Sequence, residues 1–306
     1  MPTQAELISR VSSLLRDSSV TSTTILGYLN EGNLKVAGGV LLPDGQMTKP
    51  LEELLIYSAL SSSTTLPYIS LPTAAGSAYQ RNLFMLISST QDMEISLLSP
   101  SAWMRFVRTD NLLDDTGPIS QAIVKGKRLY YNPIPTSIES LYAHYYRKPV
   151  DMVSYSASTI SFTGTTNVIT DTANGLDVFT GGIGQQIDTT GSTSNNGLFT
   201  VSTVAANGGS MVVEEDLVTE AAGDAVVIKS RAEGTPEHLQ YALLTNYACA
   251  EIFRYIESRL NLKNPRADLH EGFFMKALLD MNSFLPDIPG EVITLDDDAE
   301  YIEDGW

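Results

Sequence analysis

Residues 234–260, GTPEHLQYALLTNYACAEIFRYIESRL, have the pattern of a long amphipathic helix. Thr235 stands where a helix cap is expected, Pro236 at the first helical position and Glu237 in the first turn, as is typical of a helix N-terminus. Apolar side chains then recur near one helical face, at Leu239, Leu243, Tyr247, Ile252 and Ile256. The pattern predicts a helix over this stretch, and a further one over 266–285 that ends before a proline.

The stretch before this helix has a different composition. Between Tyr155 and Ser230 the chain is rich in Thr, Gly, Val and Asn, and Lys229 is its only base. Turn signals such as ANG, NNG and NGG separate short β-prone runs. The strand candidates are TISFTG, NVITDT, QQIDTTG, LFTVSTV, SMVVEE and AVVIKS. Short strands at close spacing indicate an all-β sandwich or small barrel.

The N-terminal part combines predicted helices with short strands. Thr3 and Glu6 have the spacing of a capping box and begin a helix that ends near Asp17. A second helix is predicted within 21–38, where it stops at Gly38 and Gly39. A third helix is predicted over 50–60. TTLPYISLP, FMLISST, MRFVRTD, RLYYNPIP and SLYAHYYRK are predicted to be extended.

These predictions together give an α+β protein in which a β module interrupts a helical domain. The predicted ranges are 1–154 plus 232–290 for a discontinuous helical domain with short strands and hairpins, 155–231 for the inserted module, and 291–306 for an acidic C-terminal arm.

Residues 125–152, KGKRLYYNPIPTSIESLYAHYYRKPVDM, contain five tyrosines beside several bases. On a strand Tyr142, His144 and Tyr146 would share one face, and RLYYNP would be the partner strand. Stacking of nucleic-acid bases is an alternative, but the net charge of the chain opposes it. The preferred prediction is a hairpin with cross-strand tyrosines, partly at an interface, formed by Tyr130, Tyr131, Tyr142, Tyr145 and Tyr146.

The overall charge is strongly negative, with 36 acidic against 19 basic residues and a formal net charge of −17. This balance argues against wrapping duplex DNA, although DNA could pass nearby without being held. Cys249 is the only cysteine, so no intramolecular disulfide can form, and its apolar neighbours indicate a buried helix position. No run of 18 apolar residues predicts a membrane span, and an aqueous, reducing compartment is expected.

Local motifs do not favour an enzyme, a cofactor or a metal. His270 and Glu271 begin a zinc-protease helix signature, but Phe274 stands where its second histidine would be. The glycines near 182–184 lack the setting of a dinucleotide loop, and Asp171 in DTANGLD fits an Asx-type turn better than a calcium site. Adjacent Asp114 and Asp115 would point to opposite faces of a strand.

The arm 291–306, EVITLDDDAEYIEDGW, has no base and two small apolar clusters. Such a segment cannot form its own core, so we expect it to dock on a partner or to remain an acidic tail. The candidate anchors are Ile293, Leu295, Tyr301, Ile302 and Trp306.

Three stretches together resemble the adaptor, or head-to-tail connector, proteins of tailed bacteriophages. They are PTQAELISRVSSLLRD with TILGYLNEGNLKVA, then GKRLYYNPIPTSIESLYAHYYRKPVDM, and finally PEHLQYALLTNYACAEIFRYIE with DLHEGFFMKALLDM. The resemblance covers residues 1–154 and 232–285. The β module resembles, more weakly, small β modules of phage structural proteins.

The resemblance implies a non-enzymatic virion protein at the neck, assembled in the host cytoplasm into a ring, commonly of twelve subunits. Its partners would be copies of itself, the portal protein, and a tail nozzle, tube or fibre protein, with DNA passing through without sequence-specific binding. A different class remains open: a carbohydrate-binding or wall-degrading tail protein that uses the β module. Its aromatic candidates are Phe162, Phe179, Phe199 and Tyr155.

Overall fold

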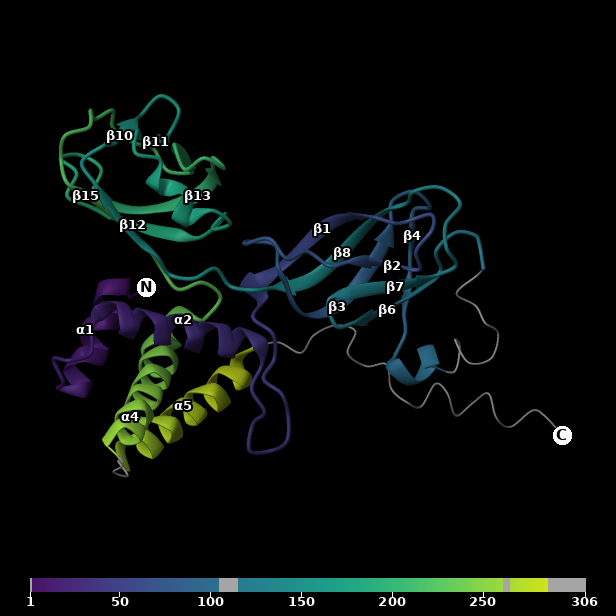
Figure 1. Ribbon diagram of the computed structural model, residues 1–306, viewed down its shortest axis with the longest axis horizontal. Coiled ribbons are helices and arrows are strands. Elements are labelled where there is room, and N and C mark those ends of the chain that lie inside the picture. The colour runs from purple at the N-terminus through teal and green to yellow at the C-terminus, as the bar shows by residue number, and fades with distance from the viewer. Residues whose placement is uncertain (1, 105–114, 261–264, 286–306) are drawn as a thin grey trace. The chain divides into compact units, whose positions relative to one another are not determined.

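The computed structural model describes residues 2–104, 115–260 and 265–285 (Figure 1). It contains helices and antiparallel sheets, so the prediction of a mixed α+β protein is confirmed. The chain forms two compact units. Among the described residues, the first comprises 2–55, 72–80, 146–260 and 265–284, and the second comprises 56–71, 81–104, 115–145 and residue 285.

Four α-helices of the first unit pack around one apolar core (Figure 1). They are α1 (Gln4–Leu15), α2 (Ser22–Gly38), α4 (Asn246–Leu260) and α5 (Pro265–Phe284). The capping box predicted at Thr3 and Glu6 is confirmed, and Thr21 caps α2 through the Thr24 amide. The core includes Leu7, Val11, Leu29, Leu244, Ile252 and Phe253.

The start predicted for the late helix is wrong in detail. Thr235 does not cap it, because this buried hydroxyl donates a hydrogen bond of 2.6 Å to Asn33 Oδ1 on α2. A 3₁₀ turn, η4 (Glu237–Leu239), and a π-helical turn, η5 (Tyr241–Thr245), precede α4 instead. The tertiary contact of Thr235 therefore overrides the local capping signal.

Seven strands of the first unit form one sheet in the order β10-β11-β14-β13-β12-β15-β9. Their bounds are β9 (Ser154–Ala157), β10 (Ile160–Thr163), β11 (Val168–Asp171), β12 (Gln186–Thr190), β13 (Gly197–Val204), β14 (Ser210–Val213) and β15 (Val226–Ser230). All six predicted strands are present, while the serine-containing β9 was missed. Its strands share a core with the 3₁₀ turn η3 (Gly175–Phe179), and this core includes Phe162, Phe179, Ile187, Met211 and Ile228.

The segments that lead into and out of this sheet lie side by side. Val153 N–H donates to Ser230 Oγ at 2.8 Å, and Ser230 N–H donates to the Val153 carbonyl at 2.9 Å. Asn30 of α2 holds both backbone groups of Met152, at 3.0 and 2.8 Å. A buried pair of Arg147 with Glu233 joins the two segments again. The sheet is thereby tied to the helices through its two ends.

The second unit contains two four-stranded sheets. One has the order β1-β8-β3-β4, with β1 (Leu55–Ser61), β8 (Ser140–Arg147), β3 (Tyr79–Ser88) and β4 (Met93–Glu94). The other has the order β2-β7-β6-β5, with β2 (Tyr68–Ser70), β7 (Arg128–Asn132), β6 (Gln121–Lys125) and β5 (Ser96–Leu97). Because these strands pair with one another, the two units group the chain differently from the predicted domain ranges, which stay predictions.

Two predictions for this unit are wrong. Residues 50–60 form a single 3₁₀ turn, η1 (Glu52–Leu54), followed by strand β1, because pairing with β8 overrides a short, ambiguous apolar run. The predicted hairpin of residues 128–133 with 140–147 does not form, since β7 pairs with β2 and β6 whereas β8 pairs with β1 and β3. The hairpin that does form is β6–β7, where Gly126 has a φ of 64° in a two-residue turn. Most of the predicted strand MRFVRTD lies outside the described residues.

The Asx-type turn predicted at Asp171 is confirmed. Its carboxylate accepts hydrogen bonds from the amides of Ala173 and Gly175, at 3.0 and 2.7 Å, and from the hydroxyls of Tyr155 and Thr159. Burial alone would raise the pKa of this carboxyl group, but the four donors outweigh burial and lower it. Asp171 therefore locks the turn before Gly175 in its ionised form.

We expect the substitution Asp171→Asn to lower the free energy of unfolding by roughly 2–3 kcal/mol at neutral pH, because a carboxylate with four donors is replaced by an amide. Since the pKa in the folded state lies below the unfolded value of about 3.9, this stabilisation is present above that value and disappears as the pH falls through the folded pKa. Urea denaturation at neutral and acidic pH measures both effects. A variant as stable as the wild type at neutral pH would contradict this role.

Candidate assembly surfaces

The five candidate tyrosines divide into buried and accessible residues. Tyr131, Tyr145 and Tyr146 are buried. The Tyr131 hydroxyl accepts from the Ser63 amide at 2.6 Å and lies 3.0 Å from the Leu66 carbonyl, and the Tyr145 and Ser58 hydroxyls are 2.9 Å apart. Burial raises the pKa of Tyr131. These three residues belong to the fold of the unit, and Tyr130 and Tyr142 remain as accessible candidates.

Tyr142 belongs to a group of exposed and half-buried rings on the β1, β8 and β3 strands, which we call the aromatic face: Tyr57, Phe84, Tyr142 and His144. The ring centroids of Tyr57 lie 6.1 Å from Tyr142 and 5.8 Å from His144, and Phe84 lies 6.1 Å from His144. Tyr57 is 66% exposed. Tyr57 was missed because β1 was predicted to be helical. The aromatic face offers a flat apolar contact surface.

Helix α5 has a second accessible apolar surface, which we call the α5 stripe: Leu269, Phe273, Leu279 and Phe284, exposed by 53%, 49%, 40% and 72%. Its opposite side, which includes His270, Phe274, Leu278 and Met281, is buried in the helical core. Charged residues such as Lys276 and Asp280 lie among these side chains, so the stripe is a set of large exposed apolar groups on a partly charged face. The apolar run FFMKALL is visible in the sequence, but the sequence does not show which of its side chains face the core and which face solvent.

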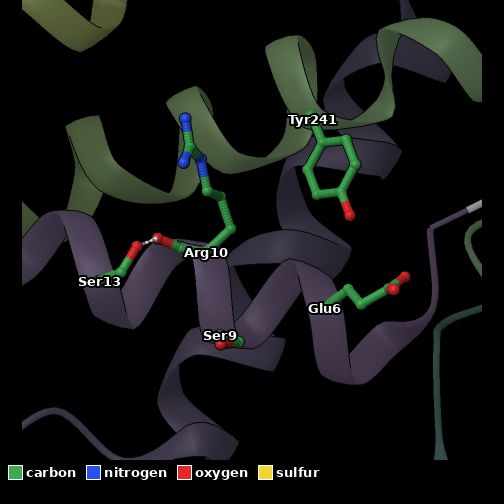
Figure 2. A pocket seen from close by; sticks show the side chains of 5 residues that line it. All are labelled: Glu6, Ser9, Arg10, Ser13 and Tyr241. Atoms are coloured by element: carbon green, nitrogen blue, oxygen red, sulfur yellow. Dashed lines mark hydrogen bonds between the residues drawn. The ribbon is translucent and has the colours of Figure 1, made fainter.

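A shallow groove of about 530 Å³ runs along α1 beside η5 (Figure 2). It is lined by Glu6, Ser9, Arg10, Ser13 and Tyr241. Figure 2 shows the Tyr241 ring pointing toward α1 and the Arg10 side chain rising from α1. Its one carboxylate, Glu6, accepts from the Thr3 amide at 2.8 Å in the capping box, which lowers its pKa. The carboxylate of the groove thus belongs to the cap of α1.

The buried titratable groups have packing partners. Burial raises the pKa of Cys249 to about 12, so this thiol is unreactive near neutral pH. His270 stacks on Phe253 and lies 2.8 Å from Asn246 Oδ1, and burial lowers its pKa. Among the described residues, no cluster of three or more His, Cys, Asp or Glu side chains is arranged to hold a metal ion. Within the same ranges, no helix has both the length and the apolar character needed to span a bilayer.

The candidate anchors of the arm, Ile293, Leu295, Tyr301, Ile302 and Trp306, lie outside the described residues, as do Asp114 and the region from residue 286. Their predicted role stays a prediction.

No protein-family model and no curated protein matches the sequence. One solved structure with similarity is the flagellar hook junction protein FlgK from Burkholderia pseudomallei, at 12% identity and a TM-score of 0.13. The alignment covers 85% of this chain and 57% of that one, which is less than two thirds of its length. So low a score carries no argument about fold or function.

Proposed function

We propose that the chain is a structural subunit of a tailed-phage neck, which assembles into a ring, commonly of twelve copies, between the portal and the tail. The proposal includes the finer architecture of a helical adaptor domain with short strands, interrupted by an all-β sandwich or small-barrel insertion. It performs no chemistry: its work is to bind its own copies, the portal protein and a tail nozzle, tube or fibre protein. The resemblance of residues 1–154 and 232–285 to adaptor proteins supports it.

The observation that carries the proposal is the α5 stripe. Leu269, Phe273 and Phe284 leave large apolar side chains in water on a helix whose other side is already buried. Because these side chains are already partly buried, covering the rest of each contributes roughly 1–2 kcal/mol, so the stripe favours association. A second copy is the simplest cover in a ring of identical subunits.

The charge of the chain suits a channel for DNA. A net charge of −17 repels phosphate, so DNA would move past the ring without being held. The arm 291–306 would dock on a neighbouring or a portal subunit through its apolar anchors.

The alternative, a carbohydrate-binding or wall-degrading tail protein, lacks an aromatic platform on the β module. Phe162, Phe179 and Phe199 are buried in the module's core, and the Tyr155 hydroxyl donates to Asp171 at 2.7 Å. Stacking on sugars requires accessible rings. The neck protein is therefore the better supported function.

Sedimentation of the purified chain through a density gradient, with and without its cognate portal protein, tests this function. We expect co-migration with portal at a mass that corresponds to a closed ring. Separate migration at every mixing ratio would reject the proposal.

Deletion of residues 291–306 is expected to leave the fold intact, because the few apolar side chains of this acidic segment would add little to the core. Attachment to portal should fall by about tenfold or more, since apolar anchors carry most of the energy of such contacts. The same sedimentation assay and a circular dichroism melt measure the two effects. Unchanged attachment would refute the docking role of the arm.

A further inference from the structure

The β6–β7 hairpin has three bases at its tip, Lys125, Lys127 and Arg128, and all three are exposed. Lys125 and Arg128 are directly opposed across the two strands. The Arg128 guanidinium lies over the Tyr68 ring at 4.4 Å, and the rings of Tyr68 and Tyr130 are 5.3 Å apart. We call this set of five residues the cationic hairpin.

The registers place four members of the cationic hairpin on the same face of the sheet. Tyr68 is opposite Tyr130, which lies two residues from Arg128 on the same strand, and Arg128 is opposite Lys125. Residues directly opposed in an antiparallel pair point to the same side. The two cations therefore stand next to a pair of aromatic rings, and Lys127 lies at the turn.

This arrangement costs stability in the isolated subunit. Like charges directly opposite each other on neighbouring strands repel. Within the described ranges, the ion pairs join Arg147, Arg231 and Arg254 to carboxylates and leave the cationic hairpin without one. In the part of the chain that the structure describes, these three bases therefore stand together without a carboxylate partner. An anionic partner would relieve this repulsion.

The partner must combine several negative charges with apolar or flat groups that can contact the rings. The segment 296–304, DDDAEYIED, has this chemistry, and no base occurs anywhere from residue 286 to the end of the sequence. The chain that follows residue 285 reaches up to about 70 Å when extended, enough to reach a neighbouring molecule. Nucleic acid fits less well, because three cations do not offset a net charge of −17.

We propose that the cationic hairpin binds the acidic segment 296–304 of a second copy of the chain. Asp296, Asp297 and Asp298 pair with the cations, and Tyr301 contacts the tyrosine rings. In the proposed ring this contact would link neighbouring subunits, but the contact is a property of the chain alone and does not depend on the portal.

Fluorescence anisotropy with a labelled peptide of residues 290–306 tests the contact. The receptor is the full chain with its own segment neutralised by Asp296→Asn, Asp297→Asn, Asp298→Asn and Glu300→Gln. We expect saturable binding that weakens by about tenfold or more in the added double variant Lys125→Gln/Arg128→Gln. Raising the ionic strength from about 0.05 to about 0.3 M should weaken it too, because salt screens exposed charges.

The matched control is Arg16→Gln/Lys276→Gln, which removes two exposed cations elsewhere and should change binding by less than about twofold. Circular dichroism establishes that each variant is folded. No binding, or equal losses in the two double variants, would overturn the proposal. Tighter binding of a single-stranded oligonucleotide of the same length would overturn it in favour of nucleic acid. Because portal is absent, failure here is distinct from failure of the neck function.

Discussion

Substitution of Arg147 by methionine is expected to lower the free energy of unfolding by about 3–5 kcal/mol. The Arg147 guanidinium forms a two-pronged ion pair with Glu233, and the two side chains are only 6% and 9% exposed. Glu233 also accepts from the Val150 amide at 3.0 Å. Removing the cation would leave the buried Glu233 carboxylate with a single backbone donor. A buried charge without its partner destabilises the folded state.

Chemical denaturation followed by circular dichroism measures this loss. The double variant Arg147→Met/Glu233→Leu should be more stable than Arg147→Met alone, because it leaves no unpaired charge. Arg254→Met is the matched control: it removes one partner of the Glu271 pair, whose side chains are 38% and 47% exposed, and should cost below about 1 kcal/mol. Equal losses for Arg147→Met and Arg254→Met would show that burial does not set the strength of the pair.

The second large effect is expected at the centre of the α5 stripe. Phe273→Glu places a charge within an apolar contact surface, and we expect ring assembly to weaken by roughly 2–4 kcal/mol, enough to abolish rings at working concentrations. The stability of the monomer should change little, since Phe273 is half exposed and its neighbour Phe274 fills the core.

Analytical ultracentrifugation over a range of concentrations, with and without portal, measures that assembly. Ser258→Glu, an equal change of charge at an exposed position of α4, serves as the control and should assemble like the wild type. If Phe273→Glu formed rings at the same concentration as the wild type, the α5 stripe would not be part of the interface.

The elements predicted correctly are those that local chemistry determines. Thr3 and Glu6 specify the start of α1 by themselves, and the strands of the seven-stranded sheet are bounded by Gly and Asn turns that need no distant partner. The helix predicted to include residues 55–60 is wrong for the opposite reason. Their apolar run suits a helix or a strand, and the pairing with β8, about 80 residues away along the chain, decides between them.

The candidate surfaces were predicted less well, because alternation along a strand gives two faces without saying which one is covered. Tyr142, His144 and Tyr146 were expected on one face of β8, yet Tyr146 is buried while Tyr142 is exposed. Nothing local indicated that the Tyr131 hydroxyl would bond to the Ser63 amide. The pairing of Lys125 with Arg128 across the two strands is set by the turn at Gly126. Tertiary pairing therefore supplied most of the information about the surfaces.

Electron microscopy of the purified chain mixed with its cognate portal protein tests the central claim most directly. The account predicts class averages in which an additional ring lies coaxial with the portal, lost with Phe273→Glu and retained with Ser258→Glu. Portal particles without added density at saturating concentrations of the chain would contradict it.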